Sequence, residues 1–424
     1  MNDMIDFRTL CRLTVTLAGL GILTVKPSPW PTNIFEWLSE YVIPPAHASN
    51  HHSSTLEELR SLPYLSWSQE DIDQKQSGVM RYDKKKAFDG YNLYTDDSSY
   101  AYLMNMTGQI VYSWRFPPPP GKWEYFRLLD NGDIVALCVG KTLVKLNQDS
   151  QLIWRSPVQA HHDIEVLPDG TFLATGRLPP VPYKGRNVQF DAIFHVSERG
   201  ETIGRWSTYE HLAELQKNHF PSKLDNENIP IEPQAKSLKT YDYYHLNTIQ
   251  TLPDTLLGQR DKKFQEGNWL TCLRNTDLIC ILDKDSRAIV WSWGPGELDW
   301  PHMPQMLDNG NILIFDNGTH RKYSRVIEID PVCGRILWEY KTDPPQNFYS
   351  EVRGSSQRLP NGNTLICESE RGHVFEVTES KEVVWEFYNP EMKDGKRKLI
   401  YRMIRIPKAK ADGWLKKRWG ADRN

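Results

Sequence analysis

One pattern recurs along most of this sequence, and this repetition restricts the fold more than any other feature. Each copy reads as a strand, a polar turn and a second strand that ends in an aromatic residue. Six copies cover Ala101–Trp114, Thr142–Trp154, Ala192–Trp206, Leu278–Trp293, Arg325–Trp338 and Val374–Trp385. Self-similarity at intervals of roughly 40–50 residues is typical of propellers and other repeat proteins.

A second hairpin pattern follows each copy of the first. It reads as an apolar strand, a turn of the type Leu-Pro/Asp-Asn/Asp-Gly, and another apolar strand. Its copies begin at Leu128, Val166, Thr251, Met306 and Arg358, and a degraded copy begins at Arg405. Asn-Gly and Asp-Gly between apolar residues are strong hairpin signals. Two hairpins supply four strands, which is one propeller blade.

The repeats therefore predict an all-β chain with a six-bladed β-propeller over residues 90–410. We expect Gly90–Thr95 to complete the last blade and close the ring, which removes an exposed edge. An insertion at residues 207–243, with a helical pattern, lengthens the third blade. Residues 49–89 are interpreted as an N-terminal extension and residues 411–424 as a basic C-terminal tail. The alternative is an open sandwich or two smaller sheets. Six copies that keep the same order of strands and turns disfavour it.

The N-terminus carries a targeting signal. Arg8 and Arg12 precede the 13-residue apolar run Leu13–Val25, and Lys26 and several prolines end it. This length fits the core of a signal peptide better than a full membrane span. An uncleaved anchor and a plain N-terminal helix are the alternatives. Residues 1–48 are thus expected to be a signal peptide or membrane anchor with a linker, and the propeller to be exported, either to the periplasm or held outside the cytosol at the membrane.

Net charge and cysteine spacing exclude two classes of protein. The formal net charge is −3, whereas a dedicated nucleic-acid binder would show a basic excess, so no nucleic-acid partner is expected. The six cysteines form no C-x-x-C pair, which argues against zinc ribbons and thioredoxin chemistry. Cys272 and Cys280 could pair outside the cytosol, but buried free thiols are the favoured interpretation.

Histidines fall at one register of the second hairpin. Counting back eight residues from the turn glycine reaches His162 and His302 in two copies, and Glu124 and Gly354 in two others. Because the inner strands of a propeller line a central channel, side chains at one register can converge there.

The copy that lacks the turn glycine fits the same register. Counting back six residues from Pro253 reaches Asn247, and His245 precedes it by two residues, on the same face of a strand. Three of the twelve histidines are therefore expected at or near one position of the channel.

Arg274 adds a cation to this set. It interrupts an otherwise apolar strand, WLTCLRNTDLICIL, and a strand-embedded arginine needs a partner or an anion. Arg177 and Asn317 share its register, and Arg177 is interpreted as a rim residue because prolines follow it at once.

The three histidines and Arg274 indicate an electropositive pocket without acidic lining, which suits a tetrahedral oxyanion such as sulfate or phosphate. Two alternatives remain open. The histidines could ligate zinc, although Arg274 beside the metal disfavours it, or each could only hydrogen-bond its neighbouring blade.

Four segments at these positions resemble the arylsulfate sulfotransferase family, bacterial enzymes that move sulfate between phenols without an activated nucleotide donor. They are HHDIEVLPDG (His161–Gly170), YHLNTIQTLPD (Tyr244–Asp254), GNWLTCLRNTDLICILD (Gly267–Asp283) and HMPQMLDNGNILIFDNG (His302–Gly318). The resemblance runs from about Gly90 to Pro407, the whole expected propeller.

The resemblance implies roles for individual residues. His302 falls on the family's nucleophilic histidine, Arg274 on its sulfate-binding arginine, and His162 and His245 on two assisting histidines. Asn247 falls on an amide ligand of the substrate. We therefore hypothesise a ping-pong transfer through a sulfohistidine, from a phenolic sulfate donor to a phenolic acceptor, with no cofactor and no metal.

The sequence also departs from the family. Larger members carry an N-terminal sandwich domain, and the segment before the propeller here is too short and polar for one, so the oligomeric state stays open. Two rival interpretations belong to other classes of protein. One is a quinone-cofactor propeller dehydrogenase, suggested by the phrase IDPVCGRILW, and the other is a non-catalytic propeller scaffold.

Overall fold

The computed structural model describes residues 66–68, 73, 75–115, 122–138, 142–217 and 240–421. It is mostly β, which agrees with the predicted all-β class. The chain divides into two units, residues 1–53 and 54–424, and the described residues all belong to the second. The predicted signal or anchor segment lies outside the described residues. Within the described ranges, no helix is long and apolar enough to cross a membrane.

Most strands belong to antiparallel sheets of four or five strands. Three of these sheets come from residues 123–293. One joins β5 (Trp123–Leu128), β6 (Ile134–Cys138), β7 (Thr142–Leu146) and β8 (Leu152–Ser156). The next joins β9 (Ala160–Val166), β10 (Phe172–Arg177), β13 (Asp191–Val196) and β14 (Thr202–Ser207). A third joins β16 (Leu246–Thr251), β17 (Trp269–Leu273), β18 (Leu278–Leu282) and β19 (Ile289–Trp293).

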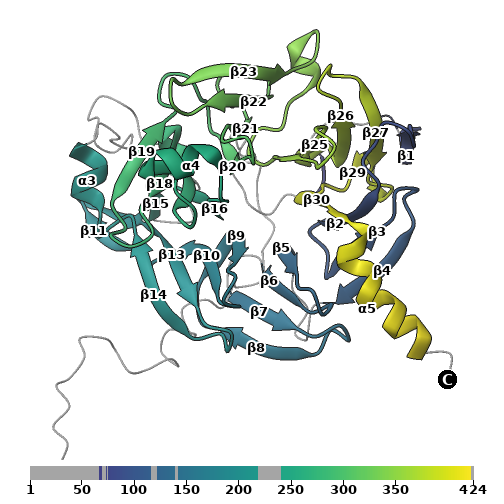
Figure 1. Cartoon of the computed structure of the whole chain (residues 1–424), viewed down its shortest axis with the longest axis horizontal. Helices are drawn as coiled ribbons and strands as arrows, with labels where there is room; N and C mark the ends of the chain where they lie inside the picture. Colours follow the sequence, from purple (N-terminus) through teal and green to yellow (C-terminus); the bar gives the residue numbers. More distant parts are fainter. Residues whose placement is uncertain are drawn as a thin grey trace, which may run out of the picture. The chain divides into compact units, whose positions relative to one another are not determined.

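Three further sheets are antiparallel in the same way. One joins β20 (His302–Met306), β21 (Ile312–Asp316), β22 (Arg325–Asp330) and β23 (Arg335–Tyr340). Another joins β24 (Ser355–Arg358), β25 (Thr364–Glu368), β26 (His373–Val377), β27 (Val383–Tyr388) and β1 (Gly78–Tyr82). The last joins β30 (Arg402–Pro407), β2 (Gly90–Thr95), β3 (Tyr100–Met104) and β4 (Ile110–Arg115). Figure 1 shows these sheets around a common centre, with β5, β9, β16, β20 and β30 innermost and β8, β14, β19 and β23 on the rim.

The two ends of the described structure meet in two sheets. β2 pairs antiparallel with β30 from Gly90 opposite Pro407 to Thr95 opposite Arg402. Gly90–Thr95 is therefore a strand that joins the chain ends, but it pairs with the first repeat copy, and β30 supplies the inner strand of that sheet. β1, which lies within the predicted N-terminal extension, pairs with β27 at the outer edge of the preceding sheet.

The repeated aromatic residues connect adjacent sheets. The indole nitrogen of Trp154 donates to the Glu198 carbonyl, in the outer turn of the next sheet, at 2.8 Å. Equivalent bonds join Trp291 to Pro331, Trp338 to Glu379, Trp385 to Met106 and the Tyr112 hydroxyl to Gln148. The Trp385 bond spans from the last repeat copy to the first. In these five copies the aromatic therefore fastens the outer strand to the following sheet, whereas the third copy has Gly204 at the aligned position.

The predicted hairpin turns form where the turn glycine is present. Gly132, Gly170, Gly310 and Gly362 have φ of 83–87°, a conformation that glycine adopts without steric cost. The copy at Thr251, which lacks the glycine, does not continue directly as a strand. There α4 (Leu256–Arg260) and the 3-10 helix η2 (Lys262–Phe264) precede β17.

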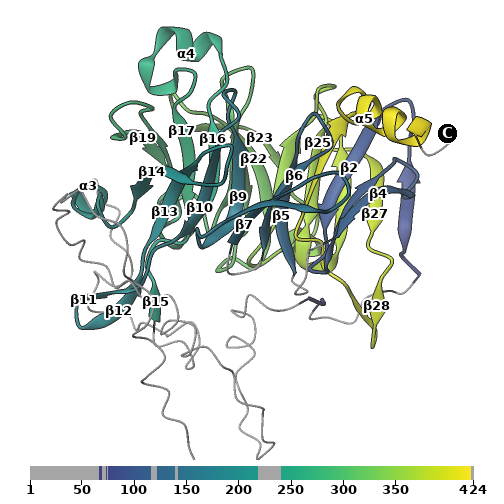
Figure 2. The same cartoon turned by 90° about the horizontal axis from the view of Figure 1, so that it is seen from below.

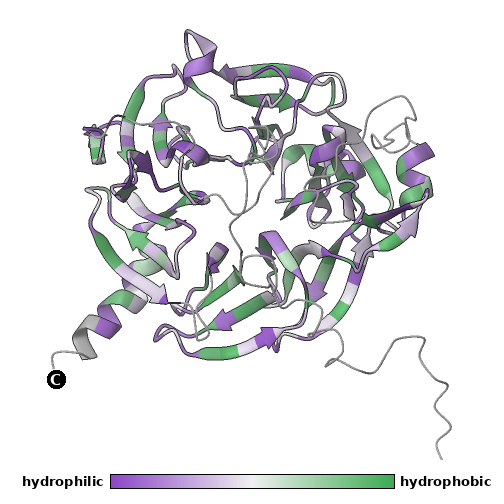
Figure 3. Ribbon diagram, turned by 180° about the vertical axis from the view of Figure 1, so that it is seen from behind, coloured by the Kyte–Doolittle hydropathy of each residue, from purple (hydrophilic) through white to green (hydrophobic). Residues whose placement is uncertain are grey.

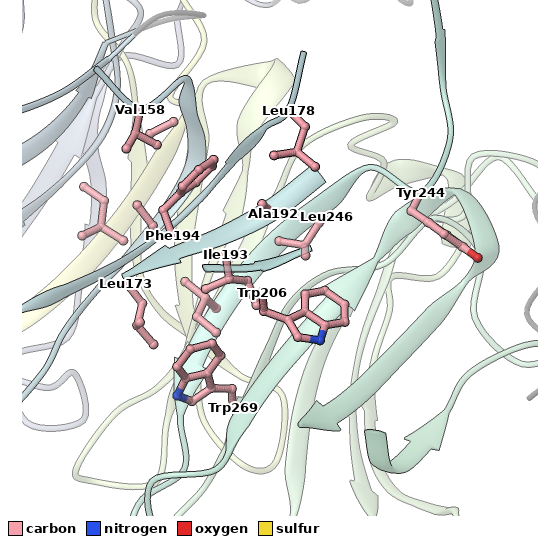
Figure 4. Packing of buried hydrophobic residues seen from close by; sticks show 14 of the residues in the cluster. Val158, Leu173, Leu178, Ala192, Ile193, Phe194, Trp206, Tyr244, Leu246 and Trp269 are labelled. Carbon is pink, nitrogen blue, oxygen red and sulfur yellow. The ribbon is translucent and has the colours of Figure 1, made fainter. Parts of the chain in front are cut away.

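Apolar side chains fill the space between neighbouring sheets. In Figure 4, Leu173 and Ile193 of one sheet lie close to Leu246 and Trp269 of the next, together with Trp206. The outer strands β4, β8, β14, β19 and β23 are partly exposed. Figure 3 shows hydrophilic and hydrophobic residues in turn along the outer strands. The middle strands β17, β18, β21 and β25 are buried along their whole length. Burial of this kind contributes about 25 cal/mol per Å² of apolar surface.

Small elements occupy the two faces of the described unit, with α4 on one face and β11, β12 and β15 on the other (Figure 2). They include β11 (Val181–Tyr183), β12 (Arg186–Gln189), β15 (Thr240–Asp242), β28 (Met392–Lys393), β29 (Lys396–Arg397), α3 (Leu212–Lys217), η3 (Arg274–Thr276), η4 (Pro345–Asn347) and η5 (Ser369–Arg371).

Most of the predicted basic tail forms helix α5 (Lys408–Ala421). Ala411, Trp414 and Leu415 of this helix are buried in one cluster with apolar residues of two sheets, that of β2 and that of β5. Arg418 forms an ion pair with Asp149 at 2.6 Å. The tail therefore packs on the fold through apolar residues that its basic composition obscured.

Candidate active site

Three inner strands bring the predicted histidines together. His162 lies in β9, His245 directly precedes β16, and His302 begins β20. The His162 and His245 rings are 4.8 Å apart between centroids, and the His162 and His302 rings are 6.4 Å apart. All three lie near the starts of their strands, whereas α4 follows the end of β16. The cluster is therefore nearer the face that carries β15 (Figure 2).

A local irregularity repeats at each histidine. His162, His245 and Met303, next to His302, have φ of 65°, 56° and 52°, which is uncommon for residues other than glycine. The pairing register of β9, β16 and β20 with its neighbour also shifts close to these positions. Such bulges re-aim side chains and are frequent beside active sites. Strand periodicity alone does not predict them.

His302 is held by one ring nitrogen. Its Nδ1 lies 2.7 Å from the side-chain oxygen of Asn317. The amide nitrogen of Asn317 donates to the carbonyls of Ser350 and Arg353 at 2.7 and 2.6 Å, so its oxygen must face the histidine. An oxygen acceptor at Nδ1 places the proton there and leaves the lone pair on Nε2.

Within the described part of the chain, Nε2 of His302 is buried and has no hydrogen-bond partner. Burial, reinforced by the Arg274 cation and opposed by the Asn317 hydrogen bond, lowers the pKa of His302 to about 3. The ring is therefore neutral near pH 7, with its free lone pair enclosed in the site. The sequence placed Asn317 at the same register as Arg274, but no sequence pattern predicted its contact with His302.

Arg274 lies beside the histidines but not in a strand. β17 ends at Leu273, and Arg274 begins the short helix η3 in the turn that leads to β18, so the predicted strand-embedded arginine is wrong. The polar residues that follow it favour a turn, and Asp277 ends the helix in the left-handed conformation with φ of 56°.

The guanidinium of Arg274 is nonetheless buried. It donates to the side-chain oxygen of Asn275 through Nε at 3.2 Å and stacks on the Trp300 ring at 4.3 Å. Burial lowers the pKa of Arg274 to about 10, an effect that Asp242 opposes. The group remains a cation at neutral pH, and its charge contributes to the lowered pKa of each of the three histidines.

Acidic side chains line the back of the cluster, so the prediction of a pocket without acidic lining is wrong. Asp242 Oδ2 is 2.5 Å from Nδ1 of His245, and Glu124 Oε1 is 3.2 Å from Nδ1 of His162. Glu124 was reached by counting the register, but its pairing with a histidine was not foreseen. Asp242 lies three residues before His245, and that spacing is the signal that could have found it.

His161 and Asp191 were also missed. Nδ1 of His161 is 2.8 Å from Nδ1 of His162, and its Nε2 is 3.3 Å from Asp191 Oδ1. The Nε2 atoms of His162 and His245 face each other at 3.1 Å. Burial first, and then neighbouring cationic groups, holds the pKa of His162 and His245 well below the usual value of a histidine.

Asn247 is fully buried behind His302. Its amide nitrogen donates to the Pro301 carbonyl at 2.9 Å, and its oxygen accepts from the Thr248 hydroxyl at 2.9 Å. The side chain therefore fixes the backbone that leads into His302. Its role as a substrate ligand stays a prediction.

The sequence left two alternatives open, zinc ligation by the histidines and a disulfide between Cys272 and Cys280. Among the described residues, no group of three or more histidine, cysteine or acidic side chains is arranged to hold a metal ion. The five cysteines within those ranges, Cys272 and Cys280 included, are free thiols.

The antiparallel sheets form a ring-like set, with buried histidines and an arginine near its centre. The protein is therefore propeller-like and carries a candidate active site. Residues 126–390, more than half of the chain and including every predicted site residue, match the family described as arylsulfotransferase (ASST). The chain belongs to the arylsulfotransferase family. Membership suggests an aryl sulfotransferase and implies aryl sulfates as substrates.

Other comparisons are more distant. No curated protein matches the sequence. A protein of unknown function from Bacteroides caccae is 16% identical, with 75% of this chain and 99% of that chain covered and a TM-score of 0.48. A streptogramin B lyase is 12% identical, with 78% and 88% covered and a TM-score of 0.43. A β-propeller domain of Cps50 (Swd1) from Myceliophteria thermophila is 9% identical, with 79% and 99% covered and a TM-score of 0.43.

Proposed function

We propose that this protein transfers a sulfuryl group from a phenolic sulfate ester to a phenolic acceptor through a sulfohistidine at His302. The observation that carries the proposal is the state of His302. Its Nδ1 is fixed by Asn317, while its Nε2 is buried in the site and has no hydrogen-bond partner among the described residues. A neutral imidazole suits attack on an anionic ester because it is not repelled.

In the first half of the reaction, Nε2 of His302 attacks the sulfur and a new N–S bond forms. The ester S–O bond breaks, and its electron pair leaves with the phenolate. In the second half, the oxygen of an acceptor phenol attacks the same sulfur and gives up its proton, the N–S bond breaks and its electrons return to His302. The proton released balances the one that the departed phenolate takes up in solution. The two halves share one enzyme intermediate, which predicts ping-pong kinetics.

Arg274 supplies the permanent positive charge for this chemistry. A guanidinium can bind two oxygens of a sulfuryl group at once and retains its charge at all working pH values. Stacking on Trp300 limits its orientations before substrate arrives. His162 and His245 complete the site as hydrogen-bonding partners of the sulfuryl oxygens or of the leaving oxygen.

The proposed architecture is one closed six-bladed propeller. Contacts between inner strands support it, because β5 touches β9, β9 touches β16, β16 touches β20, β20 touches β24 and β24 touches β30. β30 then pairs with β2, which touches β5. We also propose that the protein is exported, in the periplasm or anchored at the membrane, on the basis of Arg8, Arg12 and the apolar run Leu13–Val25.

Intact-mass measurement tests the nucleophile. The protein is mixed with 4-nitrophenyl sulfate without acceptor, quenched and weighed. We expect the wild type to gain one sulfuryl group, and His302→Asn to gain none and to lose transfer to phenol. A wild type without an adduct, or a His302→Asn variant that still turns over, would refute the assignment. A non-catalytic scaffold would transfer no sulfuryl group at all.

A further inference from the structure

A second arginine occupies the position of Arg274 in the preceding sheet. Arg177 is the last residue of β10, and Arg274 and Asn317 directly follow β17 and β21, so all three stand at the same end of the second strand from the centre. The backbone N–H of Arg177 donates to the Gln159 carbonyl, just before β9, at 2.9 Å. Because Arg274 lies beside the histidines and Asn317 bonds to His302, this end of the second strands belongs to the site.

The guanidinium of Arg177 has no partner in the part of the chain that the structure describes. Arg177 is half-buried, and its side chain forms no hydrogen bond or ion pair with any described residue. The residue opposite it on the neighbouring strand is Asp191, whose carboxylate instead bonds to His161 and to the backbone N–H of Leu246. A cation that has lost part of its hydration gains from binding an anion.

The charge of Arg177 acts on the other site residues. Burial first, and then neighbouring positive charges that include Arg177, hold the pKa of His245 well below its usual value. Burial also lowers the pKa of Arg274 to about 10, an effect that Asp242 opposes and Arg177 reinforces. Two nearby cations repel each other, and an anion bound beside one of them reduces that repulsion.

We propose that Arg177 binds a second anionic group of the substrate, a carboxylate on the aryl ring, while Arg274 binds the sulfuryl group. The inference rests on the proposed sulfuryl transfer and adds a substrate class to it, namely aryl sulfates and phenols with an acidic ring substituent. A sulfate monoester carries one negative charge, which the Arg274 guanidinium matches. The guanidinium of Arg177 is then left for a separate anion.

The depths of the two arginines assign them to different parts of the substrate. Arg274 is 6% exposed and His302 is 5% exposed, so the sulfuryl group binds at the buried end of the site. Arg177 is half-buried, and the chain continues from it to β11, on the face nearer the histidines (Figure 2). The ring is the part of the substrate that extends from the buried sulfuryl group towards solvent. An acidic substituent on the ring can therefore lie beside Arg177.

Matched donors test this assignment. They are 3-carboxyphenyl sulfate and 3-carbamoylphenyl sulfate, with the 4-isomers as a second pair. The carboxylate and the carboxamide have nearly the same shape and differ in charge. We expect Arg177→Gln to lower the carboxylate-to-amide ratio of kcat/KM roughly tenfold in at least one pair, because a hydrogen bond between charged groups contributes about that factor. Comparing ratios between variants cancels the difference between the two leaving groups.

Two further variants complete the test. Arg177→Lys keeps the charge and should retain part of the wild-type ratio. Arg199→Gln is the matched control, because Arg199 is an exposed arginine in the outer turn of the same sheet, and it should keep the wild-type ratio. The wild-type ratio itself should fall as sodium chloride is added, since ions screen a charge that is only half-buried. A ratio that does not respond to salt would overturn the inference without any variant.

The outcomes separate this inference from the proposed function. If Arg177→Gln leaves the ratio unchanged in both pairs, Arg177 does not bind the ring substituent and the inference is wrong. If it lowers kcat/KM equally for the carboxylate and the amide, Arg177 acts on the sulfuryl group or on the fold, and the inference is again wrong. In both cases a wild type that transfers sulfuryl groups keeps the proposed function. A wild type that turns over none of the four donors, and phenyl sulfate neither, contradicts both.

Discussion

Replacing Asn317 by alanine removes the one side chain among the described residues that bonds to Nδ1 of His302 and so fixes its tautomer. The amide makes three hydrogen bonds, at 2.7 Å to His302 and at 2.7 and 2.6 Å to the carbonyls of Ser350 and Arg353. At about 1 kcal/mol net for each, their loss should lower the free energy of unfolding by about 3 kcal/mol.

The catalytic effect has a separate origin. Without the Asn317 oxygen, Nδ1 of His302 keeps only the Trp300 carbonyl at 3.3 Å as an acceptor among the described residues, so its proton is held less firmly. Molecules with the proton on Nε2 cannot attack sulfur. If the variant loses this preference of about 1–3 kcal/mol altogether, the productive tautomer falls from nearly all molecules to about half, so the sulfuryl adduct should form roughly twofold more slowly. The assay is the rate of adduct formation in a single turnover with 4-nitrophenyl sulfate, followed by intact mass.

Asn268→Ala is the matched control for this prediction. Asn268 is also fully buried, donates to the Lys262 and Lys263 carbonyls at 3.1 and 3.0 Å, and accepts from the Lys284 backbone at 3.0 Å. It should lose similar stability and keep the wild-type rate. If the two variants slow the reaction equally, or if Asn317→Ala forms the adduct at the wild-type rate, the tautomer argument is refuted.

Two further predictions concern charge. Arg274→Lys keeps the positive charge but loses the bidentate guanidinium and its stacking on Trp300, so kcat/KM for phenyl sulfate should fall roughly 10–100-fold. A wild-type value would contradict the proposed binding of the sulfuryl oxygens by Arg274. His302 titrates in the unfolded chain near its usual pKa of about 6.5, but in the folded protein its pKa is about 3. The unfolded state therefore binds more protons between these values, so stability is present above pH 6.5 and falls as pH decreases towards 3. Urea unfolding at several pH values should show a shallower fall for His302→Asn than for the wild type, and identical slopes would contradict the lowered pKa.

The repeat was predictable because its signals are local. The alternation of apolar residues, the turn glycines and the recurring aromatic each lie within one hairpin, so a single copy carries them. The structure adds the reason for the aromatic, since Trp338 bonds to the Glu379 carbonyl in the following sheet. The copy at Thr251 shows the limit of such signals. An insertion with α4 and η2 separates Leu252 from Gly267, whose N–H donates to the Leu252 carbonyl and whose φ is 84°, so the turn glycine does not stand at the usual spacing.

The catalytic candidates were predictable only in part. His162 and His302 share a register that can be counted along the sequence, His245 lies two residues before that register in its copy, and the structure brings the three together. The acidic partners could not be derived in this way. Asp242 lies three residues before His245, but Asp191 belongs to β13, which β10 separates from the strand of His161 and His162, so no single spacing relates the whole set.

The sequence by itself determined the all-β class, the repeated hairpins and the histidines at or near one register, because these depend on residues within a few positions of one another. Only the tertiary structure decided the electrostatics of the site. It aimed His162 and His245 inward through left-handed backbone positions, placed Asp191 beside His161 and Asp242 beside His245, and buried Nε2 of His302 beside Arg274. Protonation depends on burial and on charges within a few ångströms, and the distances between segments remote in the chain are set only when the sheets pack.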